Sequence, residues 1–283
     1  MYDIKEVLED FKDINIDDTI NKISYPKSTS LFKKSQHKKM NIIIKTTESK
    51  DMIVKIRKSL YFYKNDFITE ILEYYKTPTN NLKSIQCSRY IKKIKDISIK
   101  NDQKNIYEPI IDDFVRILFQ ISGLDDGKIL NIESQNRIYL KINTHKIPSI
   151  PDIVCKNNRN IIWMVEESKR LNNTTYINGD IQIACHILAA FQYNQNNLKK
   201  KYRPKIIYGF KMKGTKCFFY KIKMVNCYMK CLETGIFNKS IKIYKYPKNG
   251  IDINPYNSSS YKNMKDVFCI LYNLKYNSEP LAI

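Results

Sequence analysis

Two apolar stretches of the sequence, 150–155 and 161–169, carry carboxylate side chains suited to bind a metal ion, with a lysine beside them. Asp152 lies near the start of the first stretch, and Glu167 and Lys169 close the second. A polar turn separates the stretches, which is typical of two strands in a hairpin. Two carboxylates brought together there would offer oxygen ligands to Mg²⁺ or Mn²⁺, with an ammonium group beside them.

Alternation along the second stretch predicts which of its side chains share a face. Every second side chain of a strand points the same way, so Glu167 and Lys169 are expected together with Trp163 and Val165. Glu166 is expected on the opposite face. An apolar strand that ends with a carboxylate and a lysine side by side indicates a functional site.

The letters acid-x-lysine alone carry little information in this lysine-rich chain, because the Glu-Ser-Lys at 167–169 also occurs at 48–50. The copy at 167–169 is distinguished by its context. It ends a strand, follows the only Pro-Asp pair of the chain by the length of a hairpin, and precedes a helix with Gln182 and His186 one turn apart. His186 is expected to be a residue of the helix face and not a ligand.

A plainer interpretation of the same residues stays open. Asp152 after a proline could simply shape the entry to a strand. Glu167 and Lys169 could form an exposed ion pair at the edge of a sheet, which would contribute little to stability.

The surrounding elements predict an α/β fold in which helices pack on a central sheet. An amphipathic helix is expected over 104–121, with Glu108 in its first turn, and further helices over 179–193 and 261–276. Besides the hairpin, strands are expected over 128–132, 137–142, 205–210 and 217–222.

The chain is expected to divide near residue 100. Residues 1–100 are predicted to form a mainly helical accessory region, with helices over 2–13 and 48–76 and a polar, basic loop or arm over 26–40. Residues 101–283 are predicted to form the domain that carries the site and ends in the C-terminal helix. No Gly/Pro-rich linker marks the boundary.

Pro151-Asp152, a hairpin and then Glu-Ser-Lys at 167–169 resemble the motif of the PD-(D/E)xK nuclease superfamily. The resemblance covers roughly residues 104–222. It implies a restriction-endonuclease-like core, with the order α-β-β-β-α-β and a central mixed sheet flanked by helices. The segment 208–220 also resembles the closing strands of such domains in Crinkler-type effector proteins, although no corresponding effector header is found at the N-terminus.

The resemblance also implies a role for each residue. Asp152, Glu167 and the backbone carbonyl of Ser168 would hold Mg²⁺ or Mn²⁺, with Glu108 as an outer-shell or second-metal ligand. Lys169 would orient the attacking water and stabilise the transition state. Gln182 would hydrogen-bond the phosphate or the hydrated metal. The expected activity is metal-dependent hydrolysis of DNA, and RNA stays possible as a substrate.

Composition favours a polyanionic partner. The 283 residues include 49 Lys and Arg against 28 Asp and Glu, for a formal net charge of +21. Part of this charge could reflect A/T-rich codon usage, because Lys, Asn, Ile and Tyr are all abundant. A basic stretch at 199–205 could touch a phosphate or form a solvated loop. The oligomeric state is left open, and a homodimer is compatible with the sequence.

The sequence predicts an intracellular protein of the nucleus or cytoplasm. Seven cysteines at irregular spacing favour reduced thiols over a disulfide framework or a zinc site. The charged start at 1–6 does not resemble a signal peptide, and no apolar run approaches the roughly 18 residues of a membrane span. The alternative to a nuclease is a non-catalytic nucleic-acid-binding, effector or interaction module that keeps the fold.

Overall fold

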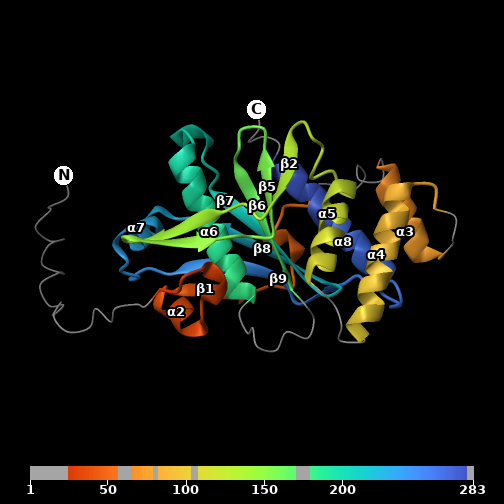
Figure 1. Ribbon diagram of the computed structural model, residues 1–283, viewed down its shortest axis with the longest axis horizontal. Helices are drawn as coiled ribbons and strands as arrows, with labels where there is room; N and C mark the ends of the chain where they lie inside the picture. The colour runs from red at the N-terminus through yellow and green to blue at the C-terminus, as the bar shows by residue number, and fades with distance from the viewer. Residues whose placement is uncertain (1–24, 57–64, 79–81, 103–107, 170–178, 279–283) are drawn as a thin grey trace, which may run out of the picture.

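A seven-stranded mixed sheet forms the centre of the protein (Figure 1). The computed structural model describes residues 25–56, 65–78, 82–102, 108–169 and 179–278. The expected helix over 2–13 therefore lies outside the described residues. The strand order is β1-β9-β8-β7-β6-β5-β2, with bounds β1 Ile42–Thr46, β2 Leu130–Ser134, β5 Ile153–Asn157, β6 Ile162–Lys169, β7 Ile206–Lys213, β8 Lys216–Lys223 and β9 Ile241–Asp252.

Strand directions follow from the lengths of the connections. β5 and β6 are joined by a tight turn and pair antiparallel, as do β7 and β8. β6 and β7 are joined across helix α6 (Gly179–Asn197) and pair parallel, because only a crossover connection can bring the chain back in the same direction. β2 pairs antiparallel with β5, β9 pairs antiparallel with β8, and β1 pairs parallel with β9.

Helices cover both faces of the sheet, so the fold is α/β with layered packing (Figure 1). One face packs against α3, α4, α5 and α8 in one continuous apolar cluster. The other face packs against α6 and α7 in a second cluster. The helix bounds are α2 Lys34–Lys39, α3 Asp66–Lys76, α4 Ile85–Asp102, α5 Glu108–Ile121, α7 Asn226–Thr234 and α8 Ser260–Ser278.

Helix α6 is buried on nearly every side because it lies between two layers. Its inner side approaches β7 so closely that a Cβ at Gly209 would lie 2.9 Å from Ile187 Cδ1, so glycine is required there. A separate antiparallel hairpin, β3 (Ile138–Ile142) and β4 (His145–Ser149), covers its outer side. The Gln192 side chain joins α6 to this hairpin through the backbone of Lys141.

Several expectations about the elements are confirmed and others are wrong. The helix expected over 104–121 is present as α5 from Glu108 onward, while residues 104–107 lie outside the described residues, and the hairpin of β5 and β6 is present. The expected helix over 48–76 is not continuous, because residues 53–56 after the 3-10 turn at Lys50–Met52 are not helical and α3 begins only after its N-cap, Asn65. The strand expected over 137–142 exists but belongs to the outer hairpin and not to the central sheet.

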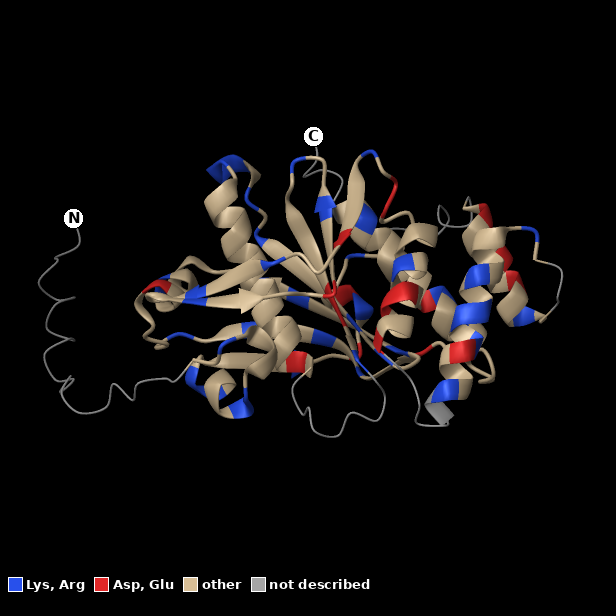
Figure 2. Ribbon diagram, viewed as in Figure 1, with Lys and Arg blue, Asp and Glu red and all other residues tan. Residues whose placement is uncertain are grey.

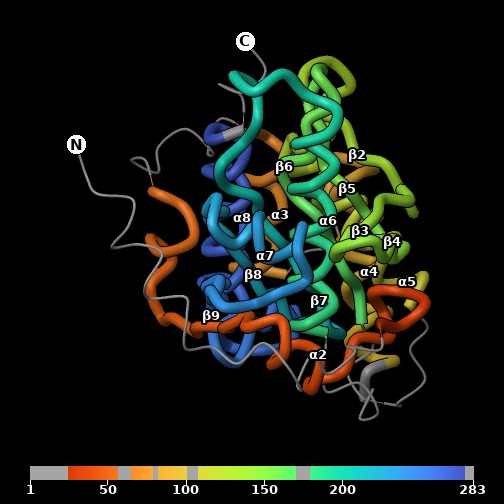
Figure 3. The backbone as a smooth tube through the Cα atoms, turned by 90° about the vertical axis from the view of Figure 1, so that its left-hand side faces the viewer, coloured from red at the N-terminus to blue at the C-terminus, as the bar shows by residue number. Residues whose placement is uncertain are grey.

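The first and last parts of the chain contribute strands that local patterns did not predict. β1 lies in the region expected to be accessory, yet it pairs with β9, which is distant in sequence (Figure 3). α7 and β9 were also not predicted. The division near residue 100 stays a prediction, although apolar side chains of α3 and α4 share one cluster with those of α5 and α8.

A bulge changes the expected alternation in β6. Lys156 pairs with Ile162 and Cys155 pairs with Met164, so Trp163 is the extra residue on its strand. Trp163 accordingly packs in the same cluster as Met164, and not with Val165 as alternation predicted. The regular pattern resumes after the bulge.

None of the described helices is long and apolar enough to cross a membrane.

Candidate functional site

The start of β5 and the end of β6 meet at one end of the sheet, because the two strands are antiparallel. The Asp152 N–H donates to the carbonyl of Glu166 at 3.2 Å. In return, Asp152 Oδ2 accepts a hydrogen bond from the backbone N–H of Ser168 at 2.8 Å. The Asp152 carboxylate is therefore held against the strand that carries Glu167 and Lys169.

Glu167 is buried on the face of the sheet that α6 covers. Its side chain forms an ion pair with Lys169, and its Oε2 lies 2.9 Å from His186 Nε2. The other ring nitrogen of His186, Nδ1, lies 2.7 Å from Ser149 Oγ. Both ring nitrogens of His186 are thus engaged, so Ser149 and Glu167 together orient the ring, and the ring orients Glu167.

The opposite face of β6 holds a second group of polar side chains beneath α5. The Ser168 hydroxyl donates to Glu166 Oε1 at 2.8 Å, and both residues are completely buried. Burial raises the pKa of Asp112 of α5, which lies close to Ser168. Figure 2 shows acidic residues on α5 next to the end of the strands.

Acidic groups outnumber basic ones in this acid cluster, which we define as Asp112, Asp152, Glu166 and Glu167. Burial, followed by the charge of Glu167, raises the pKa of Asp152 to about 8. Burial and the charge of Asp152 raise the pKa of Glu166 well above its usual value, and burial raises that of Asp112. Asp152, Glu166 and Asp112 therefore hold their protons more tightly than ordinary carboxyl groups do.

Glu167 and Lys169 differ from the rest of the cluster because they stabilise each other's charge. Burial opposes ionisation of Glu167, yet the hydrogen bond from His186 and the charge of Lys169 outweigh it and lower the Glu167 pKa. Burial likewise opposes the charge of Lys169, but the carboxylates of Glu167, Glu108 and Asp152 outweigh it and raise the Lys169 pKa. This pair is therefore ionised at neutral pH.

The structure brings most of the residues expected at the site to one place. Asp152, Glu167 and Lys169 converge, and Glu108 at the start of α5 is close enough for its charge to act on Lys169 and Asp112. Ser168 contacts Asp152 through its backbone N–H and Glu166 through its hydroxyl. Gln182 is half-buried on α6, and no hydrogen bond between described residues joins it to the cluster.

Sequence reasoning did not identify Asp112 and expected His186 to be only a helix-face residue. The spacing between Glu108 and Asp112 could have revealed Asp112, because residues four apart lie on one side of a helix. Glu166 was placed on the correct face, opposite Glu167, but its part in the acid cluster was not foreseen. The contact between His186 and Glu167 has no local signal, since it joins α6 to β6.

The chemistry of the acid cluster fits a hard divalent cation. All its donors are oxygen atoms, and the buried atoms Asp112 Oδ1 and Glu166 Oε2 have no hydrogen-bond partner within the described part of the chain. Among the described residues, no group of three or more His, Cys, Asp or Glu side chains is already arranged to hold a metal. The cluster thus has the charge and the donors for a cation, without a ligand set that is already arranged.

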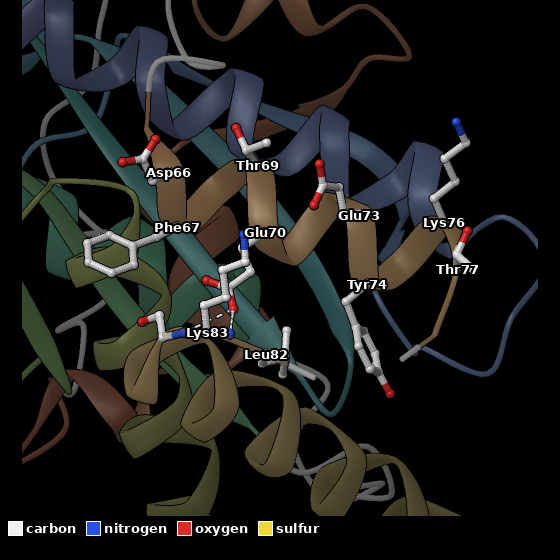
Figure 4. A pocket seen from close by; sticks show the side chains of 11 residues that line it. Asp66, Phe67, Thr69, Glu70, Glu73, Tyr74, Lys76, Thr77, Leu82 and Lys83 are labelled. Atoms are coloured by element: carbon white, nitrogen blue, oxygen red, sulfur yellow. Dashed lines mark hydrogen bonds between the residues drawn. The ribbon is translucent and has the colours of Figure 1, made fainter. Parts of the chain in front are cut away.

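A cavity of about 810 Å³ lies elsewhere, beside α3 and the start of α4 (Figure 4). Glu70 on its wall accepts a hydrogen bond from the backbone N–H of Ser84 at 3.0 Å and a second from that of Lys83. None of the residues of the acid cluster lines this cavity. Its walls do not contribute to the chemistry described above.

Fold and site together define an α/β protein with a mixed central sheet and a buried group of carboxylates at the end of one strand pair. Comparison of the chain with protein-family models and with curated proteins finds no match. The function therefore has to be argued from the site itself.

Proposed function

We propose that this protein is a metal-dependent nuclease that hydrolyses phosphodiester bonds of nucleic acid, with DNA as the expected substrate and Mg²⁺ or Mn²⁺ as the cofactor. The observation that carries the proposal is the excess of buried carboxylates beside Lys169 at the end of β6. Buried carboxylates without matching cations are costly, and a divalent cation offsets that cost.

The arrangement of elements supports the same proposal. The order α5, β2, β5, β6, α6, β7, with β2, β5 and β6 antiparallel and β7 parallel to β6, is the order expected of a restriction-endonuclease-like core. The hairpin β3–β4 is then an insertion, and β8, β9 and β1 extend the sheet on the far side of β7.

Each residue has a physical task in this mechanism. Asp152 and Glu167 would hold the metal, which lowers the pKa of a bound water and neutralises charge on the scissile phosphate. Lys169, kept protonated by Glu167, would orient the water and stabilise the negative charge that develops on the phosphate oxygens. His186 positions Glu167 and does not touch the substrate. Gln182 would donate a hydrogen bond to the phosphate.

The raised pKa values of Asp152 and Asp112 couple metal binding to protons. A carboxyl group with a raised pKa holds its proton more tightly, so a cation that binds there displaces the proton, and metal binding would release protons. We infer that Asp112, with Glu108, supports the metal from the α5 side. The mechanism thus uses carboxylates from α5, β5 and β6.

The test is a cleavage assay on plasmid DNA, single-stranded DNA and RNA with Mg²⁺, Mn²⁺ or EDTA. Glu167→Gln and Lys169→Met are expected to abolish cleavage. Glu48→Gln is a matched control, because Glu48 lies in the same Glu-Ser-Lys sequence but is exposed and follows β1, which is separated from β6 by three strands of the sheet. Cleavage that survives Glu167→Gln, or that is insensitive to EDTA, would contradict the proposal.

A non-catalytic module that binds nucleic acid, or an effector or interaction protein, is the second candidate. It is favoured by the lack of an arranged metal-ligand group among the described residues and by the direct ion pair between Glu167 and Lys169. It predicts salt-dependent binding of nucleic acid without cleavage under any metal. Either candidate would act in the nucleus or cytoplasm.

A further inference from the structure

A second buried group of charges lies beside the acid cluster and has the opposite balance. Asp180, in the first turn of α6, accepts hydrogen bonds from Lys211 on β7 and, at 2.7 Å, from Lys245 on β9. The Tyr220 hydroxyl donates to the same carboxylate at 2.7 Å. We call Asp180, Lys211 and Lys245 the basic cluster.

The basic cluster holds more positive charge than its partners compensate. Two ammonium groups share one carboxylate, although Lys211 is only 6% exposed and Lys245 only 9%. Their Nζ atoms lie 4.8 and 4.7 Å from the centre of the Phe218 ring, which stabilises cations only partly. Burial and the charge of Lys245 lower the pKa of Lys211 to about 8, against the opposing effect of Asp180.

The position of the basic cluster relates it to the proposed nuclease site. Lys211 is the ladder partner of Glu167, and paired residues of neighbouring strands lie on the same face of a sheet. At Gly179, a Cβ would lie 3.4 Å from Lys211 Cδ and 3.8 Å from Lys169 Cγ, so both lysines flank the start of α6. The free N–H groups of that first helical turn add positive potential.

The cluster is open on the side of Asp180 and continues into basic surface. The Asp180 side chain is 27% exposed. Its charge also acts on His37 of α2, which places α2 close by. Exposed lysines of α2 extend the positive charge outward from there (Figure 2): Lys34, Lys38 and Lys39.

We propose that the basic cluster is a subsite that binds one phosphodiester group of the nucleic-acid backbone, next to the bond that the acid cluster would cleave; this inference rests on the proposed function. The single negative charge of a phosphodiester matches the single uncompensated positive charge of the cluster. A terminal phosphate carries about 1.5 to 2 negative charges at pH 7 and matches it less well. A purely structural contact would need only one lysine to neutralise Asp180.

The experiment measures binding of a short fluorescent single-stranded DNA in EDTA, so that cleavage does not enter. A series of otherwise identical strands carries one uncharged methylphosphonate at each position in turn. For the wild type, one position should weaken binding by about tenfold, as expected for one charge-assisted contact. Lys245→Met should lose this sensitivity at that position and no other, and the slope of log affinity against log salt should fall by about 0.7.

Two further variants keep the result interpretable. Lys223→Met removes one exposed positive charge from the opposite end of the same sheet and should retain the wild-type profile. Asp180→Asn raises the net charge of the basic cluster and should tighten binding by about three- to tenfold. If Asp180 only anchors α6 to the sheet, Asp180→Asn leaves affinity unchanged or lowers it.

The subsite is overturned if Lys245→Met shows the wild-type profile at every position, or if no DNA strand binds. Circular dichroism of each variant confirms that it is folded, and Lys245→Arg, which keeps the charge, should restore the sensitivity. A protein that retains the position-specific effect but never cleaves would contradict the nuclease proposal alone. A protein that cleaves normally but shows no position-specific effect of the methylphosphonate would contradict the subsite alone.

Discussion

The acid cluster and the basic cluster are neighbours on one sheet, and their charge imbalances have opposite signs. The acid cluster has four carboxylates and one neighbouring lysine, Lys169, whereas in the basic cluster two lysines share Asp180. Burial raises the pKa of Asp152 in one and lowers that of Lys211 in the other, because each cluster lacks its counter-ion. A metal cation would be the counter-ion of the acid cluster, and a neighbouring phosphodiester would be the counter-ion of the basic cluster.

The comparison also explains why the overall charge of +21 is a poor guide to the site. The basic stretch at 199–205 precedes β7, whereas the acid cluster lies where β6 ends. Parallel strands begin at the same end of a sheet, so this stretch lies at the opposite end from the acid cluster. Lys211, the ladder partner of Glu167, and Lys245, which shares Asp180 with Lys211, are fewer but better placed.

The largest effect is expected from Asp152→Asn, which should change activity and stability in opposite directions. Asp152→Asn should lower the cleavage rate by at least about a hundredfold, since it removes a metal ligand. It should also raise the free energy of unfolding at pH 8 by about 1 kcal/mol or more, because an uncompensated buried carboxylate is destabilising. Cleavage kinetics and thermal unfolding in EDTA measure both. Loss of activity together with loss of stability would mean that Asp152 is structural.

A divalent metal should stabilise the folded protein through the acid cluster and not through the basic cluster. With Mg²⁺ or Mn²⁺ at about a hundred times its dissociation constant, the free energy of unfolding should rise by about 2.7 kcal/mol in the wild type. Asp152→Asn should lose most of this gain, whereas Lys245→Met should keep it. Thermal unfolding with and without metal provides the measurement. Equal stabilisation of both variants would place the metal elsewhere.

Stability should depend on pH with opposite signs in the two clusters. A carboxyl group whose pKa is raised on folding binds more protons in the folded state, so Asp152 should cost stability as pH rises from about 4 to about 8. A lysine whose pKa is lowered on folding binds fewer protons in the folded state. Lys211 should therefore increase the free energy of unfolding as pH rises from about 8 to about 10.5.

Denaturant unfolding across pH 5–10 in EDTA tests these slopes. Asp152→Asn should flatten the lower range and leave the upper range unchanged, and Lys211→Met should do the reverse. Each change is expected to be a few kcal/mol over its range, since one unit of pKa shift corresponds to about 1.4 kcal/mol. If one substitution alters both ranges equally, the clusters titrate as one unit and the comparison fails.

The smallest effect is expected from the basic stretch at the far end of the sheet. Lys200 is exposed, so Lys200→Gln should change cleavage by less than about twofold and stability by less than about 0.5 kcal/mol. The Lys223→Met variant provides a comparison at the same end. A loss as large as that of Lys245→Met would show that binding follows overall charge and not the basic cluster.

The sequence by itself determined the elements that have strong local periodicity. The hairpin of β5 and β6 and the amphipathic helix α5 are present, and the class α/β follows from their order. These predictions held because a 3.6-residue or two-residue repeat requires only neighbouring residues. The meeting of Asp152 with Glu167 and Lys169 was also predictable, because a hairpin brings its two ends together.

Only the tertiary structure decided which side chains from distant elements join them. Asp112 comes from α5, His186 from α6, and the pairing of Lys211 and Lys245 with Asp180 joins β7, β9 and α6. β1 and β9, too, pair across almost two hundred residues. Such contacts depend on how layers pack and not on local repeats. The charge balance of each cluster, and with it the pKa of every group in it, therefore appears only when the sheet and its helices are assembled.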